Sequence, residues 1–130
     1  MNQAFRLFLG LGLATKETYS LTDRLLGFLN LVPPIFLFLT PLNAASAAVL
    51  SIQGYPPWDK CILGFIAVAF AGGGIVALNS YIDRERDKTI WPERPIPSRR
   101  IKANSALIYA ISLFIGALLL SWFFFNPVNF

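Results

Sequence analysis

Cys61-Ile-Leu-Gly-Phe-Ile-Ala-Val-Ala-Phe-Ala-Gly-Gly-Gly-Ile-Val-Ala-Leu78 is an uncharged apolar stretch that leads directly into Asn79-Ser-Tyr-Ile-Asp83-Arg-Glu-Arg-Asp87. The apolar part is close to the ~20 residues that a helix needs to cross a ~30 Å hydrocarbon core. Ala106 to Phe125 is a second stretch of the same kind. We therefore expect both stretches to span a membrane, with the charged residues after Leu78 at the membrane surface.

The composition excludes several classes of protein and site. With 55% hydrophobic residues and a mean hydropathy of +0.58, the chain does not have a soluble-domain profile. The absence of histidine excludes imidazole general-base catalysis and His-ligated zinc, and the single cysteine, Cys61, excludes a disulfide framework within the chain. Seven of the eleven Lys and Arg residues lie between Arg84 and Lys102, so the net charge of +4 comes from one loop. This distribution does not indicate a nucleic-acid-binding surface.

The stretch from Leu25 to Ile52 also lacks charge, but prolines interrupt it. Because proline removes an intrahelical hydrogen bond, a straight helix is not expected across Pro33 to Pro41. We expect a first span over about 35–52, kinked or begun near Pro41, and further spans over about 61–80 and 104–125. The predicted fold class is all-α, a transmembrane bundle of about three spanning helices. Residues 1–24 are expected to form a cytoplasmic or interfacial segment, and residues 25–130 the transmembrane domain.

The distribution of basic residues predicts the orientation of the chain. Basic loops favour the cytoplasmic side of a membrane. The loop between the last two predicted spans carries seven basic residues, whereas Lys60 is the only one between the first two. We therefore expect an integral, multi-pass membrane protein whose 79–102 region faces the cytoplasm.

Asn79, Asp83 and Asp87 stand four residues apart, at the end of the second predicted span. If the helix continues through them, their side chains share one face, because four-residue steps return to nearly the same side. Two carboxylates and a carboxamide form an oxygen-rich strip that suits Mg²⁺. The alternative is a solvated helix end with ion pairs worth a few tenths of a kcal/mol each. Asn79 favours the functional interpretation, because an unpaired carboxamide in an apolar span costs roughly 1–3 kcal/mol.

Pro92-Glu-Arg-Pro-Ile-Pro-Ser98 follows the acidic strip at a short distance. Its prolines favour an extended segment of low conformational entropy, which could hold Arg94 beside the strip. Arg94 would then offer a planar fork of donors to a phosphate. The alternative is a stiff loop whose arginines are attracted to anionic lipid headgroups.

Together, Asn79 to Asp87 and Arg94-Pro-Ile-Pro-Ser98 resemble the first aspartate-rich motif and adjoining loop of the UbiA superfamily of intramembrane prenyltransferases. The residues in and around the motif are most similar to those of geranylgeranylglyceryl phosphate synthases and chlorophyll synthases. The resemblance covers the chain from about Ile35 onward. It implies a helical membrane fold of about nine spanning helices around a central cavity. This chain would form the N-terminal part of that fold.

The resemblance also implies an activity and roles for individual residues. The activity is the Mg²⁺-dependent transfer of an isoprenoid group from a prenyl diphosphate to a lipid or aromatic acceptor, which belongs to the class of enzymes that transfer alkyl or aryl groups other than methyl. Asp83, Asp87 and Asn79 would be the catalytic residues: Asp83 and Asp87 would bind Mg²⁺, and Asn79 would be a further Mg²⁺ ligand or a contact to the diphosphate. Arg94 would contact the phosphates, and Lys88 is a further candidate for the same role.

The chain departs from the family pattern in three places. Ser80 stands where the family often has an aspartate, and Arg99 replaces a glycine, which makes a positive φ difficult. The family's second aspartate-rich loop is missing from these 130 residues, so we expect little activity from the chain alone. A non-catalytic, three-span protein whose basic loop binds anionic lipid or a partner is the alternative. A partner chain that supplies the remaining helices is a third interpretation.

Overall fold

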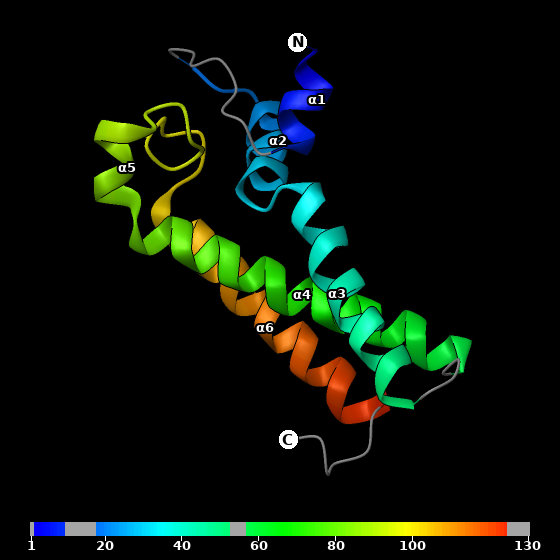
Figure 1. The fold of residues 1–130 in the computed structure, drawn as a ribbon. Helices are drawn as coiled ribbons and strands as arrows, with labels where there is room; N and C mark the ends of the chain where they lie inside the picture. Colours follow the sequence, from blue (N-terminus) through cyan, green and yellow to red (C-terminus); the bar gives the residue numbers. More distant parts are fainter. Residues whose placement is uncertain (1, 10–17, 53–56, 125–130) are drawn as a thin grey trace.

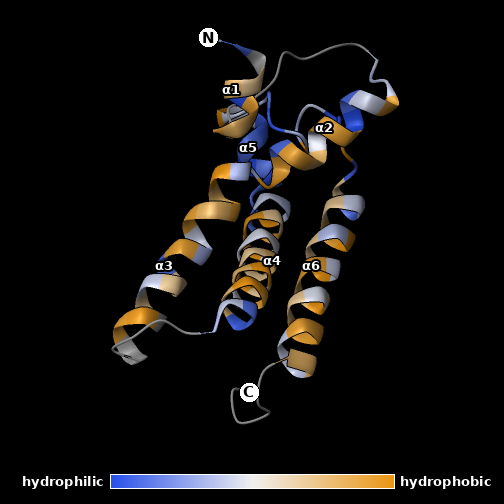
Figure 2. Cartoon of the chain, turned by 90° about the vertical axis from the view of Figure 1, so that its right-hand side faces the viewer, coloured by the Kyte–Doolittle hydropathy of each residue, from blue (hydrophilic) through white to orange (hydrophobic). Residues whose placement is uncertain are grey.

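The computed structural model describes residues 2–9, 18–52 and 57–124. Within these ranges every element is helical: α1 (Gln3–Phe8), α2 (Leu21–Leu31), α3 (Pro34–Ile52), α4 (Trp58–Ile82), α5 (Arg84–Ile90) and α6 (Ala103–Phe124). The long apolar helices α3, α4 and α6 lie alongside one another, and α1, α2 and α5 gather at one end of them (Figures 1 and 2). The prediction of an all-α fold is confirmed.

Three helical stretches are long and apolar enough to cross a membrane: Leu21–Ala47, Trp58–Ile82 and Ala103–Phe124. The last two correspond to α4 and α6, on which the expected spans over 61–80 and 104–125 fall, although residue 125 lies outside the described residues. The first stretch takes in α2 and most of α3, and the expected span over 35–52 falls on α3.

Local sequence explains why α2 and α3 are separate helices. α2 begins at a capping box, in which the Ser20 hydroxyl accepts a hydrogen bond from the Asp23 N–H (3.2 Å) and the Asp23 carboxylate accepts one from the Ser20 N–H (3.1 Å). It ends before Pro33, which lacks an N–H and disfavours a helical conformation at the residue before it. Pro34 occupies the first position of α3, where its fixed φ suits a helix. The break therefore falls before Pro34, and Pro41, where we expected a kink or a start, lies inside α3.

α4 is the central helix, because it packs against both α3 and α6. Small side chains allow this close approach. An ideal Cβ on Gly74 of α4 would lie 3.1 Å from the ring of Phe114 on α6, and Ala77 and Ala110 are fully buried. The three long helices thus form one layer with α4 in its middle.

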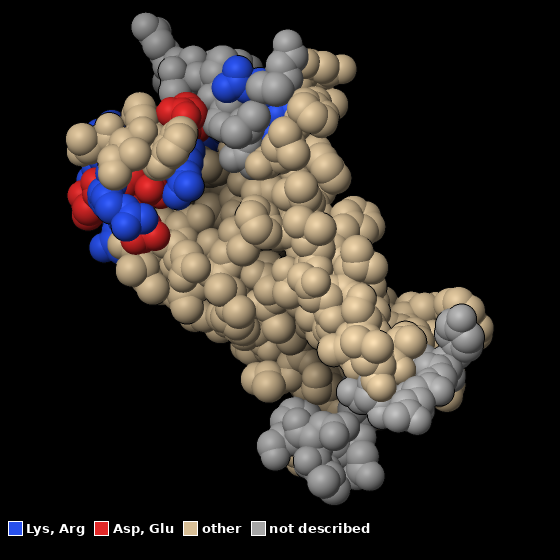
Figure 3. Space-filling view, viewed as in Figure 1, with Lys and Arg blue, Asp and Glu red and all other residues tan. Residues whose placement is uncertain are grey.

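A buried apolar cluster lies at the end of the layer that carries the charged residues. Its members come from the end of α2, the last turns of α4, the loop before α6 and the start of α6: Leu31, Val32, Ala77, Ile101, Ala106 and Ala110. This cluster fixes the loop between α5 and α6 against α4. Figure 3 shows that the Lys, Arg, Asp and Glu side chains visible on this face gather at the same end, whereas the long helices present an uncharged surface.

Candidate functional site

The residues of the acidic strip lie on two helices rather than on one. α4 ends at Ile82, Asp83 stands between the helices with φ −77° and ψ 0°, and α5 begins at Arg84. The helix therefore does not continue unbroken from Asn79 through Asp87, and α5 departs from the direction of α4 (Figure 1). The four-residue hydrogen-bonding pattern continues on both sides of the bend. The Asp83 N–H donates to the Asn79 carbonyl (2.8 Å), and the Asp87 N–H donates to the Asp83 carbonyl (2.9 Å).

The side chain of Arg84 lies against the end of α4, next to the bend at Asp83. Its Nη1 donates to the carbonyl of Tyr81 (2.9 Å), near the end of α4, where carbonyl groups lack partners within the helix. Its guanidinium also lies 4.4 Å from the centroid of the Tyr81 ring. Arg84 thus stabilises the C-terminus of α4, and the chain turns into α5 directly after it.

One cavity of about 700 Å³ is lined by all three residues of the strip. The described residues that line it come from α1, α2, α3, α4, α5 and the loop after α5: Arg6, Leu9, Asn30, Leu31, Pro33, Phe36, Val76, Asn79, Ser80, Asp83, Arg86, Asp87, Trp91, Glu93, Arg94, Pro95, Ile96 and Pro97. Charged groups and apolar side chains share this lining. The cavity can therefore hold a charged headgroup and part of an apolar tail side by side.

Asp87 is the most deeply buried of the three strip residues, with 1% of its surface exposed. Its Oδ2 accepts a hydrogen bond from Nη1 of Arg94 at 2.7 Å. Its Oδ1 is buried as well and has no hydrogen-bond partner among the described residues. Because a buried carboxylate oxygen without a partner is costly, this atom is a candidate ligand for a cation.

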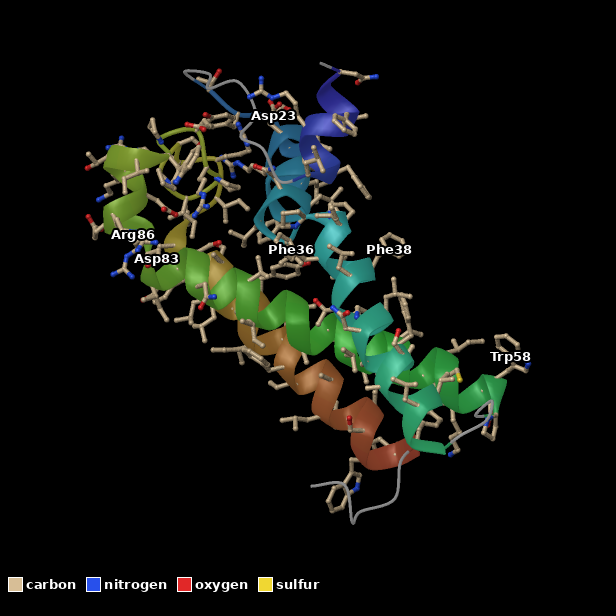
Figure 4. All side chains as sticks on the ribbon, in the orientation of Figure 1. Asp23, Phe36, Phe38, Trp58, Asp83 and Arg86 are labelled. Carbon is tan, nitrogen blue, oxygen red and sulfur yellow. The ribbon has the colours of Figure 1, made fainter. Side chains whose placement is uncertain are left out.

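Asp83 and Arg86 lie next to each other at the junction of α4 and α5, at the opposite end of α4 from Trp58 (Figure 4). Nη2 of Arg86 lies 3.1 Å from Oδ2 of Asp83, and both side chains are partly exposed. Asn79 is exposed, and it lines the cavity from the last turn of α4. Ser80, at the position where the family often has an aspartate, donates instead to the Val76 carbonyl (3.0 Å).

The loop after α5 is a series of turns and not the extended segment that its prolines led us to expect. The Arg94 N–H donates to the Trp91 carbonyl and the Ser98 N–H to the Arg94 carbonyl, both at 3.0 Å. These turns place the Arg94 guanidinium against Asp87 and 5.8 Å from the centroid of the Trp91 ring. Arg94 therefore lies beside the acidic strip, as expected, but a series of turns places it there rather than an extended segment.

Arg99 adopts the positive φ that we expected its side chain to disfavour. Its φ is +60°, and among the described residues other than glycine it is the only one with a positive value. The turn is held by hydrogen bonds from the Arg99 N–H to the Ile96 carbonyl and from the Ile101 N–H to the Pro95 carbonyl, each 3.0 Å long. The next two residues, Arg100 and Ile101, are buried, so the packing of the loop maintains the conformation.

Lys88 is not among the residues that line the cavity. Its Nζ lies 2.7 Å from Oε2 of Glu85 on the exposed side of α5. The hydrogen bond and the positive charge of Lys88 lower the pKa of the Glu85 carboxyl below its usual value. The position of Lys88 gives no support to its predicted contact with a phosphate.

The oxygen donors of the strip suit Mg²⁺ better than a metal that needs a full set of protein ligands. Across residues 2–9, 18–52 and 57–124, no group of three or more His, Cys, Asp or Glu residues is arranged to hold a metal. Asp83 and Asp87 offer two carboxylates and Asn79 a carboxamide at one cavity. Mg²⁺ usually binds through one or two carboxylates and substrate phosphates and keeps several waters. The unpartnered Oδ1 of Asp87 agrees with this donor set.

Sequence reasoning missed several residues of the cavity. Arg86 was considered only among the ion pairs of a solvated helix end, and its pair with Asp83 at i,i+3 is present, but its place in the cavity lining was not predicted. Asn30 is buried and lines the cavity from α2, where an asparagine in an uncharged stretch was the available signal. Arg6 and Leu9 reach the cavity through the position of α1, which no sequence pattern indicated.

Comparison with known proteins identifies the family of the chain. The family model described as the UbiA prenyltransferase family matches residues 25–130. The digeranylgeranylglyceryl phosphate synthase of Methanothrix thermoacetophila is 47% identical over 90 residues, which are 64% of this chain and 34% of the relative. That of Thermococcus kodakarensis is 30% identical over 96 residues, or 74% of this chain and 35% of the relative.

A protein named for a different acceptor is similar as well. The protoheme IX farnesyltransferase of Acidiphilium cryptum is 34% identical over 119 residues, or 84% of this chain and 36% of the relative. The chain thus spans about a third of the length of the curated relatives that it matches. No solved structure matches it. The match over residues 25–130 shows that the chain belongs to the UbiA prenyltransferase family.

Proposed function

We propose that this chain forms part of an intramembrane prenyltransferase that transfers an isoprenoid from a prenyl diphosphate to a hydrophobic acceptor. The family membership supports this proposal, and the observation that carries it is the lining of one cavity. Asn79, Asp83 and Asp87 line the cavity together with apolar side chains such as Phe36 and Val76. A substrate with a diphosphate head and an isoprenoid tail requires both kinds of surface in one place.

Each group at the cavity has a role in this proposal. Asp83, Asp87 and Asn79 would hold Mg²⁺, which when bound neutralises the charge that develops on the departing diphosphate. Arg94 donates through one of its N–H groups to Asp87, and its remaining donors can bind phosphate oxygens. Phe36, Val76 and other apolar lining residues would surround the isoprenoid and exclude water from the reacting carbon. We leave Lys88 out of the proposed site.

Binding of a prenyl diphosphate to the purified chain in lipid nanodiscs tests the proposal. We expect geranylgeranyl diphosphate to bind in the presence of Mg²⁺ and to bind much more weakly after EDTA treatment. Asp87→Asn should abolish the Mg²⁺-dependent part of the affinity. Glu85→Gln is the matched control, because Glu85 lies on the same short helix, is exposed and does not line the cavity. Metal-independent binding, or equal effects of the two substitutions, would contradict the assignment.

We also propose that the 79–102 region faces the cytoplasm, which its basic residues support. The test uses a chain in which Cys61→Ser removes the native cysteine. Thr89→Cys, at an exposed position of α5 beyond the C-terminal end of α4, and Asp59→Cys, at the start of α4, then report on the two sides of the membrane. A membrane-impermeant maleimide should label the first variant in inverted vesicles and the second in right-side-out vesicles. The reverse pattern would overturn the orientation. Supply of further helices by another chain or segment stays a prediction.

A further inference from the structure

Helix α1 forms part of the cavity wall although it lies outside the family match. The match begins at residue 25, whereas α1 covers Gln3–Phe8. α1 contacts α2 and α3, the two helices that supply Asn30 and Phe36 to the lining. Arg6, in the last turn of α1, and Leu9, directly after it, line the same cavity as the acidic strip. Both side chains are partly buried.

Arg6 contributes its charge to the cavity from a different part of the chain than the other lining arginines. Arg86 and Arg94 come from the segment that carries the acidic strip, and each forms an ion pair with one of its aspartates, Asp83 at 3.1 Å and Asp87 at 2.7 Å. Arg6 brings its charge from a different element, on the side of the cavity formed by α1, α2 and α3. Among the described lining residues there are three arginines and three acidic residues, so without Arg6 the lining would carry a net negative charge.

We propose that Arg6 is a ligand-binding residue, whose guanidinium donates to the phosphate oxygens of an anionic amphiphile held in the cavity. This inference rests on the proposed function and extends it to a segment outside the family match. Leu9 places an apolar side chain on the same wall, next to the position from which Arg6 enters. The described part of the lining contains as many acidic residues as arginines, and Arg6 adds to it a positive charge with planar donors suited to phosphate oxygens.

The test compares Arg6→Gln with Arg24→Gln in phosphatidylcholine nanodiscs, with geranylgeranyl diphosphate and inorganic diphosphate as the probes. Arg24 is exposed on α2 and does not line the cavity, so the control removes the same charge from a nearby helix. Loss of a charge-assisted hydrogen bond should weaken binding of both probes by about tenfold in Arg6→Gln. Arg24→Gln should stay within about twofold of the unmodified chain, because salt screens distant charges.

Two further measurements separate binding from a structural role of Arg6. Arg6→Lys retains the charge and should recover part of the affinity. The melting temperature without ligand should be similar for Arg6→Gln and Arg24→Gln, while the increase caused by geranylgeranyl diphosphate should shrink only in Arg6→Gln. If the unmodified chain binds the probe and both Gln variants bind equally well, the role of Arg6 is overturned and the proposed function stands. If the unmodified chain binds neither probe, both proposals fail.

Discussion

Nη1 of Arg94 lies 2.7 Å from Oδ2 of Asp87 and ties the turn after α5 to the buried side of α5. The two side chains differ in exposure: 2% of the Asp87 side chain is accessible, against 42% of that of Arg94. A carboxylate in this position depends on its partner, because its charge has little access to water. The ion pair therefore positions the loop and, at the same time, offsets part of the cost of burying the Asp87 carboxylate at the cavity.

The dependence is unequal, which the two single variants of a double-mutant cycle can measure, while the cycle itself gives the coupling energy of the pair. Arg94→Gln leaves a buried carboxylate without its cation, whereas Asp87→Asn leaves an arginine that can turn toward solvent. We expect Arg94→Gln to destabilise the chain more, with a coupling energy between the two positions of about 1 kcal/mol. Thermal unfolding in detergent, followed by circular dichroism, gives these values. The exposed Lys88 and Glu85 pair on the same helix is the control and should show weaker coupling. Equal coupling in the two pairs would contradict the role of burial.

The Glu85 carboxyl should titrate below its usual pKa. The hydrogen bond from Lys88 is the main cause, and the charge of Lys88 adds to it, because both stabilise the ionised carboxylate. The interaction favours the folded state above the pKa of the unfolded chain, and this contribution is lost as the pH falls through the lower pKa of the folded chain. NMR titration of the Glu85 side chain in micelles measures the value. Lys88→Ala should return the pKa most of the way to normal, while Arg84→Ala should change it less.

The sequence predicted the features that depend on composition and local pattern. Long uncharged stretches indicated α4 and α6, and the first span expected over 35–52 falls on α3, whereas α2 was not predicted as a helix. Four-residue spacing indicated the acidic strip, because the backbone hydrogen bonds of Asp83 and Asp87 keep that spacing even where the helix bends. These features depend on residues close to one another in the sequence, so they can be predicted without knowledge of the tertiary contacts.

Features set by tertiary contacts were not predictable in the same way. The bend at Asp83 occurs beside a hydrogen bond from the Arg84 side chain to the Tyr81 carbonyl, and no sequence pattern indicated either feature. The place of Arg6 at the cavity depends on how α1 rests on α2 and α3, and the residues between α1 and α2 carry no pattern that indicates it. The φ of Arg99 opposes local preference and is maintained by buried neighbours.

Gly27→Ala should loosen the contact between α2 and the loop that precedes α6. An ideal Cβ at residue 27 would lie 3.0 Å from Cδ of Arg100 and 3.0 Å from Cγ1 of Ile101. Both neighbours are buried and cannot move aside into solvent. Overpacking lowers the free energy of unfolding by about 1–3 kcal/mol, and the better helix propensity of alanine raises it by up to about 1 kcal/mol. We expect a net loss of about 1 kcal/mol in the free energy of unfolding.

Thr22→Ala is the matched control for this substitution. Thr22 lies on the same helix with its side chain exposed, so alanine there improves helix propensity without a new contact. Thermal unfolding of both variants under the same conditions gives the comparison. A Gly27→Ala chain as stable as Thr22→Ala would mean that the loop can yield at Arg100 and Ile101 at no cost.

Arg99→Gly should stabilise the chain, although it removes a basic residue from the loop. A residue with a Cβ pays roughly 1–2 kcal/mol for the left-handed conformation that Arg99 adopts at φ +60°. Glycine avoids that cost, but it raises the entropy of the unfolded chain, which lowers the free energy of unfolding by about 0.5–1 kcal/mol. The expected net gain is about 0.5–1 kcal/mol.

Thermal unfolding measures this gain in Arg99→Gly, with Arg99→Ala as the control. Alanine removes the same exposed, charged side chain but keeps the Cβ. Only glycine should raise the melting temperature. An equal rise in both variants would assign the gain to the lost charge, and no rise in either would show that the packing of Arg100 and Ile101 does not impose the strained φ at residue 99.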